Sequence, residues 1–369
     1  MFLSALTLAG LLLQGQQPDG PIRVDTLLTR DGSQARLFIE RNETPMLQPK
    51  KGPKRFGENK VQFEFEWLTR GTVIVHTNGQ HDLRMRVYSQ ERKPENDAAH
   101  AVTRMMLRLW DMNYRRVHLD QPPNSLGYQI LNVFITWGGK AGGEQFFGPD
   151  FEGKTRVTAN TIYFYDLASF TDPLEMAREV AHEYGHATLP PIGGYKERED
   201  WANGYLGEKL YLTWIRDVLA QGLLLPEDFM GVKKEQLDPW IAANVDPLVL
   251  KTAEKPPTMG TLADRTAKGM DAYLGLALYA AQILPENVFA RSLKLTGSQN
   301  ARDYPGAIFL ALEEPDEVPI TIPDILKGKA IWLPTGKGFV TGAKVLAIEN
   351  GWTKVQTGSD PIVIRTKRV

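Results

Sequence analysis

Two of the six histidines in this sequence lie four residues apart, and a glutamate directly follows the first. The segment reads His182-Glu183-Tyr184-Gly185-His186. Because residues i and i+4 of an α-helix share a face, both imidazoles would project together at a spacing that suits one Zn²⁺ ion. Glu183 would lie beside that ion, where its carboxylate could take a proton from an activated water and pass it to a leaving amine. The spacing therefore predicts a zinc site on His182 and His186, with Glu183 as the catalytic base.

A catalytic zinc of this kind has a third protein ligand, and the remaining residue types restrict that ligand to a carboxylate. The chain contains no cysteine, and no histidine follows His186. The acidic residues that follow within reach are Glu197, Glu199, Asp200 and Glu208. The residue types alone do not decide which of these four is the third ligand.

Residues 199–203 read EDWAN, and together with the HExxH segment they resemble the gluzincin branch of the zinc peptidases. In several gluzincin families the ligand glutamate opens an ExxAD or ExxAN motif, so the resemblance implies a zincin-like domain in which Glu199 completes the zinc site. It also implies that Asn203 supports the first histidine. Both side chains would then project from one face of a second helix, which we expect from about Glu197 to Ala220.

Glu208 is the alternative third ligand. Its longer separation from His186 is typical of thermolysin-like enzymes. Gly204 and Gly207 would let the helix that carries Glu208 approach the zinc closely.

Zincins also polarise the reaction intermediate with a His, Tyr or Arg side chain. Since no histidine is left for this role, the resemblance assigns it to Tyr205, with the more distant Tyr273 as the alternative. The segment Val157–Leu167 alternates and then becomes aromatic, so it predicts a strand. It resembles the edge strand along which zincins bind an extended substrate, and a plain buried strand is the other interpretation.

The elements around the motif indicate an α+β protein. Asp172, Pro173 and Glu175 form an N-terminal helix signature, and Pro190 ends that helix after Leu189. Turn residues and alternating segments predict a β-rich start, and the last forty residues return to short strands. The predicted organisation is a signal peptide at 1–15, a β-rich domain at 21–92, a zincin-like domain with a helical C-terminal part at 93–312, a linker at 313–329 and a small SH3-like β-barrel at 330–369.

The N-terminal segment is expected to direct export. Residues 2–13 are apolar and would span roughly 18 Å as a helix, which is too short for a bilayer core of about 30 Å. That length suits a signal peptide, with a buried strand or helix as the alternative. No other stretch is long enough to cross a membrane. We therefore expect a secreted, periplasmic or cell-envelope protein with no membrane span in the mature chain.

Charge and composition restrict the partners. The chain has 43 basic and 44 acidic residues, so no attraction to nucleic acid is expected. The basic segment 49–60 lacks interleaved aromatic residues other than Phe56 and predicts a solvated hairpin tip. The tail around Gly351 and Trp352 resembles bacterial SH3-like modules, which implies either contact with cell-wall peptides or packing against a catalytic domain.

These observations lead to two hypotheses from different classes. The first is an exported zinc peptidase that hydrolyses peptide bonds in a peptide or protein substrate. The second is a catalytically inactive zincin-fold binding or scaffold protein of the cell envelope, which the open choice of third ligand and the missing oxyanion histidine motivate.

Overall fold

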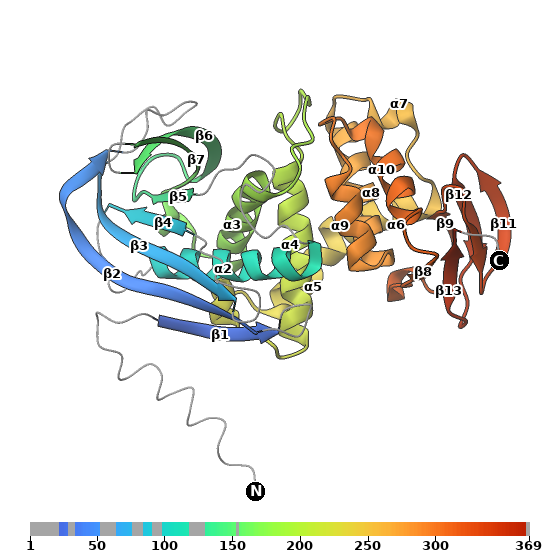
Figure 1. Cartoon of the computed structure of the whole chain (residues 1–369), viewed down its shortest axis with the longest axis horizontal. Coiled ribbons are helices and arrows are strands. Elements are labelled where there is room, and N and C mark those ends of the chain that lie inside the picture. Colours follow the sequence, from blue (N-terminus) through green and yellow to red (C-terminus); the bar gives the residue numbers. More distant parts are fainter. Residues whose placement is uncertain are drawn as a thin grey trace, which may run out of the picture. The chain divides into compact units, whose positions relative to one another are not determined.

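The computed structural model describes residues 22–28, 34–51, 64–75, 84–90, 98–117, 130–152 and 155–366. They form a mixed α+β protein, as the sequence predicted. The predicted signal peptide at 1–15 lies outside the described residues. The chain divides into two compact units, Met1–Leu107 with Gly127–Ser169 and Arg108–Leu126 with Phe170–Val369. Figure 1 shows the elements of each unit along the chain.

The first unit is built on one seven-stranded sheet. Its order is β1-β2-β3-β4-β5-β7-β6. Neighbouring strands from β1 to β4 are antiparallel, β4, β5 and β7 run parallel, and β6 is antiparallel to β7. The strands are β1 Ile22–Leu28, β2 Gln34–Lys51, β3 Glu64–Val75, β4 Arg84–Ser89, β5 Ile130–Ile135, β6 Gly142–Glu152 and β7 Thr155–Tyr165.

This pairing differs from two of our predictions. The boundary expected at residue 92 falls within a single sheet, because β4 pairs with β5 across it. Helix α2, Ala98–Val117, makes the long crossover that a parallel pair requires. Of the two interpretations of Val157–Leu167, the edge strand is wrong and the buried strand is confirmed, because β7 pairs with β5 on one side and β6 on the other and residues 160–165 are buried. Alternation predicts that a segment is a strand, but it contains no information about the strand's neighbours.

An aromatic row fills one buried part of this sheet. Tyr88 and Phe134 are register partners on β4 and β5, and their rings stack with centroids 4.8 Å apart. Phe134 stacks on Tyr163 of β7 at the same distance, and Tyr165 and Phe146 extend the row at 5.8 Å. Cross-strand aromatic pairs of this kind stabilise a particular register. They therefore stabilise the register of β4, β5 and β7.

The second unit contains the remaining helices. A buried ion pair holds the second half of α2 within it, since Arg108 Nη2 lies 3.0 Å from Asp228 Oδ1 and both side chains are almost inaccessible. The helices are α3 Pro173–Thr188, α4 Asn203–Ala220, α5 Lys234–Asn244, α6 Asp246–Glu254, α7 Met259–Leu262, α8 Ala267–Ile283, α9 Glu286–Lys294 and α10 Tyr304–Leu312. Short 3₁₀ turns occur at η1 Leu167–Ser169, η2 Pro226–Phe229, η3 Ala301–Asp303 and η4 Asp324–Leu326. No helix in the described ranges has the length and apolar character needed to cross a membrane.

Helix α3 begins and ends where its sequence predicts. Asp172 is the N-cap and accepts a hydrogen bond from the backbone N–H of Leu174 at 2.9 Å, with Pro173 at the first helical position. The helix ends at Thr188, ahead of Pro190. The capped start fixes the phase of α3 and thus the face on which its two histidines project.

The C-terminal strands form two three-stranded sheets rather than following a plain linker. β8 lies inside the segment expected to be a linker, and it pairs with β13. The sheet orders are β10-β13-β8 and β11-β12-β9. The tail packs on the helices, since the Phe309 and Trp352 rings lie 5.7 Å apart and Tyr279 Oη donates to the Trp332 carbonyl at 2.9 Å. The strands are β8 Glu317–Ile320, β9 Ala330–Pro334, β10 Phe339–Thr341, β11 Lys344–Glu349, β12 Trp352–Gln356 and β13 Ile362–Arg365.

Helices α3 and α4 cross at backbone distance through glycine. A Cβ added to Gly207 would lie 2.4 Å from Gly185 Cα, and one added to Gly185 would lie 2.8 Å from Gly207 Cα. Real Cβ atoms do not approach backbone atoms this closely, so neither position accepts a side chain without separating the helices. The glycines therefore set the spacing of the helix pair.

Gly207→Ala is expected to destabilise the protein by about 1–3 kcal/mol, the usual cost of overpacking. Gly306→Ala is the matched control, because Gly306 is also helical and a Cβ there meets nothing within 4 Å. The control should gain about 0.5–1 kcal/mol from helix propensity. Thermal unfolding followed by calorimetry measures both, and a Gly207→Ala variant as stable as wild type would contradict the close crossing.

Candidate metal centre

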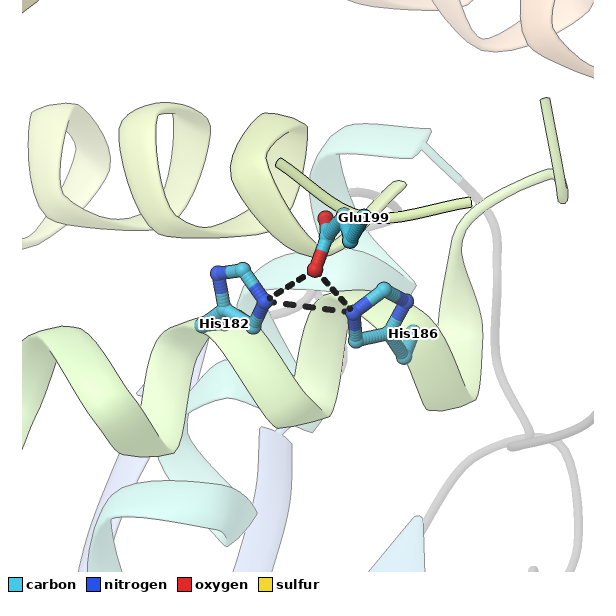
Figure 2. A group of neighbouring side chains, drawn as sticks. All are labelled: His182, His186 and Glu199. Carbon is cyan, nitrogen blue, oxygen red and sulfur yellow. Dashed lines mark hydrogen bonds and ion pairs between the residues drawn. The ribbon is translucent and has the colours of Figure 1, made fainter. Parts of the chain in front are cut away.

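Three side chains bring one potential ligand atom each to a common point (Figure 2). His182 and His186 project from the same face of α3, and Glu199 reaches them from the loop before α4. Glu199 Oε2 lies 3.1 Å from His182 Nε2 and 3.3 Å from His186 Nε2. The two Nε2 atoms lie 3.2 Å apart. The structure thus brings together the three residues that the sequence assigned to the metal.

These distances match a tetrahedral ion. Nitrogen and oxygen ligands about 2.0–2.1 Å from Zn²⁺, at tetrahedral angles, are about 3.3 Å apart. Two further oxygens point to the same conclusion, because Glu183 Oε2 and Glu199 Oε1 are buried without a hydrogen-bond partner in the part of the chain that the structure describes. Buried polar atoms are nearly always paired. The donor set therefore fits a metal ion in this position.

The loop that carries Glu199 corrects our prediction for the second helix. That helix begins at Asn203, not near Glu197, so Glu199 precedes it. Arg198 has a left-handed backbone at φ 65° directly before the ligand, and Gly193 forms an antiparallel bridge with Trp201. Glu199 and Asn203 therefore do not share a helical face. A tight loop, rather than helical periodicity, aims the carboxylate at the imidazoles.

Contacts with the start of α8 fix this loop from outside. Arg198 makes two hydrogen bonds to Asp271, at 2.7 and 3.2 Å. Glu197 Oε2 accepts from the backbone N–H of Ala267 at 2.9 Å, which occupies one of the carboxylates considered as a third ligand. Asp200, another of those candidates, is exposed. The surrounding contacts thus leave Glu199 as the carboxylate of the loop that faces the histidines.

A second layer of polar groups orients both imidazoles. Asn203 Nδ2 donates to the carbonyls of His186 and Leu189, so its Oδ1 accepts from the His186 Nδ1–H at 2.8 Å. This arrangement leaves the His186 Nε2 lone pair free for a metal. Asn203 therefore supports the second histidine, whereas the resemblance implied the first. The loop geometry explains the difference, since Asn203 starts α4 beside the C-terminal end of α3.

Glu208 supports the first histidine. Its Oε2 lies 3.7 Å from His182 Nδ1, on the side of the ring opposite the ligand atom, and its Oε1 accepts from Arg178 Nε at 2.7 Å. The alternative third ligand thus lies behind His182 rather than at the metal position. The sequence contains no local signal for this role or for that of Arg178, because the two residues lie thirty positions apart on separate helices.

The electrostatics of the cluster favour a cation. Burial disfavours charge on His182, but hydrogen bonds to Glu199 and Glu208 outweigh it and raise the His182 pKa well above its ordinary value. Burial alone would raise the pKa of Glu199, yet its bonds to the two histidines lower it to about 2. Burial raises the pKa of Glu183 to about 7. Carboxylates that stabilise positive charge on an imidazole would also stabilise a divalent ion between the imidazoles.

Gly204 and Tyr205 complete the surroundings. A Cβ added to Gly204 would lie 2.2 Å from His186 Nε2 and 2.5 Å from His182 Nε2, so only glycine leaves room at the ligand atoms. The Tyr205 ring packs edge-on against His182 with centroids 4.8 Å apart. Tyr273 is fully buried with its ring against Tyr304, so it belongs to the core. Of the two tyrosines considered, Tyr205 is the one that contacts a ligand histidine.

The sequence matches no protein-family model, and no curated protein matches it. The functional assignment therefore depends on the residues and geometry of the site itself.

Glu199→Ala and Glu208→Gln are expected to separate the ligand from its supporter. Removing Glu199 deletes one of three ligands, so stably bound metal should be lost. Glu208→Gln should keep the metal and weaken its affinity by about 10–100-fold, as supporting residues typically do.

Metal content per chain and competition with a chelator measure both effects. Asp200→Ala is the control, because this neighbouring carboxylate is exposed, and it should retain metal as wild type does. Loss of metal from Glu208→Gln together with retention in Glu199→Ala would reverse the assignment.

Proposed function

We propose that this protein is a gluzincin-like, zinc-dependent peptidase in which His182, His186 and Glu199 hold one Zn²⁺. The observation that carries the proposal is the convergence of three ligand atoms within 3.1–3.3 Å, next to a buried carboxylate with an unpartnered oxygen. The HExxH spacing by itself would also fit two histidines on an ordinary helix. The third carboxylate and the two supporting groups support the metal site over an ordinary helix.

The donor set favours zinc in a catalytic rather than a structural role. Two imidazoles and one carboxylate are typical of hydrolytic zinc sites, and structural zinc sites usually have four protein ligands. Three protein ligands would leave a position for water. When bound, zinc would act as a Lewis acid and lower the pKa of a water molecule.

Glu183 would move the proton in this reaction. It follows His182 directly, its side chain is buried, and Oε2 has no partner among the described residues. The carboxylate would accept a proton from the attacking water and later donate it to the leaving amine nitrogen. Tyr205 would stabilise negative charge on the carbonyl oxygen through its hydroxyl, as its place beside His182 suggests.

The chain order of the elements supports the zincin-like part of the proposal. β4, β5 and β7 are parallel, β6 is antiparallel at the end of the sheet order, and β7 precedes the HExxH helix. An edge strand can bind an extended peptide as an additional strand, and β6 rather than β7 ends the sheet order. Export to the cell envelope, and cell-wall contact by an SH3-like tail, belong to the same proposal and derive from the sequence.

Glu183→Gln is expected to retain zinc and lose peptidase activity by at least about a hundredfold, because it removes the base and leaves the ligands in place. Cleavage of a quenched fluorescent peptide library, with metal content measured on the same sample, tests this. Glu175→Gln is the control, since Glu175 is an exposed carboxylate on the same helix. Equal turnover of Glu183→Gln and wild type would refute the assigned base, and a zinc-loaded wild type without turnover would favour the scaffold hypothesis.

A further inference from the structure

A cavity of about 460 Å³ lies beside the loop that carries Glu199. Three segments of the second unit line it, namely residues 193–201 in part, 262–265 and 298–302. Cavities that bind small molecules usually have volumes of about 300–1,000 Å³. The cavity is therefore large enough for a ligand of dipeptide size.

The charged groups that line this cavity are mostly cationic. Arg265 and Arg302 contribute guanidinium groups, and Asp264 contributes the one carboxylate among the lining residues. Asp264 Oδ1 already accepts from the backbone N–H of Thr266 at 2.9 Å, at the start of α8. Within residues 155–366, neither arginine forms an ion pair. The cavity thus presents a net positive charge, from two guanidinium groups against one carboxylate.

Hydrogen bonds position both arginines. Arg265 Nε donates to the carbonyl of Gly194, and a Cβ on Gly194 would lie 3.2 Å from Arg265 Nη2. Gly194 has φ 90°, a conformation that glycine adopts readily. Arg302 lies in η3, where its backbone N–H donates to the Asn300 side chain at 3.1 Å. One N–H of Arg265 is therefore used, and the remaining guanidinium donors of both residues stay available for a ligand.

The other lining groups suit an organic anion. Trp201 is 42% exposed, and its ring packs flat over Gly193, which leaves an apolar surface at the cavity. Ser298, Gln299 and Asn300 add neutral donors and acceptors from a neighbouring segment, whose Gln299 carbonyl accepts from the Gly193 N–H at 3.2 Å. A guanidinium group matches the two oxygens of a carboxylate, and an aromatic face accommodates the carbon skeleton attached to it.

We propose that this cavity binds the carboxylate group of a small organic acid or of a peptide C-terminus, with Arg265 and Arg302 as its recognition residues. Binding requires neither zinc nor turnover, so the proposal stands apart from the peptidase assignment. Because Gly193 and Trp201 belong to the loop that positions Glu199, a bound acid would contact the support of the third ligand.

Isothermal titration calorimetry with N-acetyl-Ala-Ala tests the proposal on the full chain, both zinc-loaded and metal-free. The free acid should bind at least about tenfold more tightly than the same dipeptide as its C-terminal amide, because the amide lacks the charged acceptor. Acetate should compete if a small organic acid is sufficient, and failure of acetate to compete would restrict the ligand to peptide C-termini. Inorganic phosphate that binds more tightly than the acid would overturn the carboxylate assignment.

Arg302→Ala should weaken binding of the acid by about tenfold or more. Arg265→Ala should do the same and provides a second, independent variant. Arg291→Ala is the control, because this exposed arginine pairs with Glu314 outside the cavity. Equal binding of acid and amide, no binding of the acid, or wild-type affinity in both cavity variants would overturn the proposal. Failure of the peptidase assignment would leave binding to the metal-free chain unaffected.

Discussion

The close crossing of α3 and α4 is the constraint on which the site depends. Gly185 and Gly207 place the two backbones in direct contact, and Gly204 leaves room at the histidine ligand atoms. This proximity lets Asn203 and Glu208, both on α4, reach the Nδ1 atoms of histidines on α3. A side chain at any of these glycines would enter the space that the site needs. The hydrogen bonds and ion pairs around the imidazoles therefore depend on the glycines that let the two helices approach.

The charges around the imidazoles favour a cation between them. Glu199 and Glu208 approach His182 from opposite ring atoms, and Glu183 is buried next to it. Buried carboxylates are costly unless positive charge or hydrogen bonds compensate. The partly exposed Arg178 compensates the charge of Glu208, since its Nε lies 2.7 Å from Glu208 Oε1. A divalent ion between the imidazoles would neutralise the charge of Glu199.

The predictable part of the site is the part that local sequence determines. The cap at Asp172 and the four-residue spacing of the histidines place two ligands on one helical face, and the structure has that arrangement. The ExxAN motif predicts Glu199 as a ligand on a helix, and Glu199 does face the histidines, but it lies in a loop. Arg198 adopts a left-handed conformation in that loop and pairs with Asp271. The role of Glu208 and the pairing of β4 with β5 depend on distant segments. Neither leaves a periodic pattern in the sequence.

Zinc K-edge X-ray absorption on the zinc-loaded protein tests the central claim most directly. We predict a first shell of nitrogen and oxygen ligands at about 2.0–2.1 Å, with the outer-shell scattering of two imidazoles. His186→Ala should lose one imidazole contribution. A shell without imidazole scattering, or a wild-type spectrum unchanged in His186→Ala, would contradict a metal centre built on the HExxH helix.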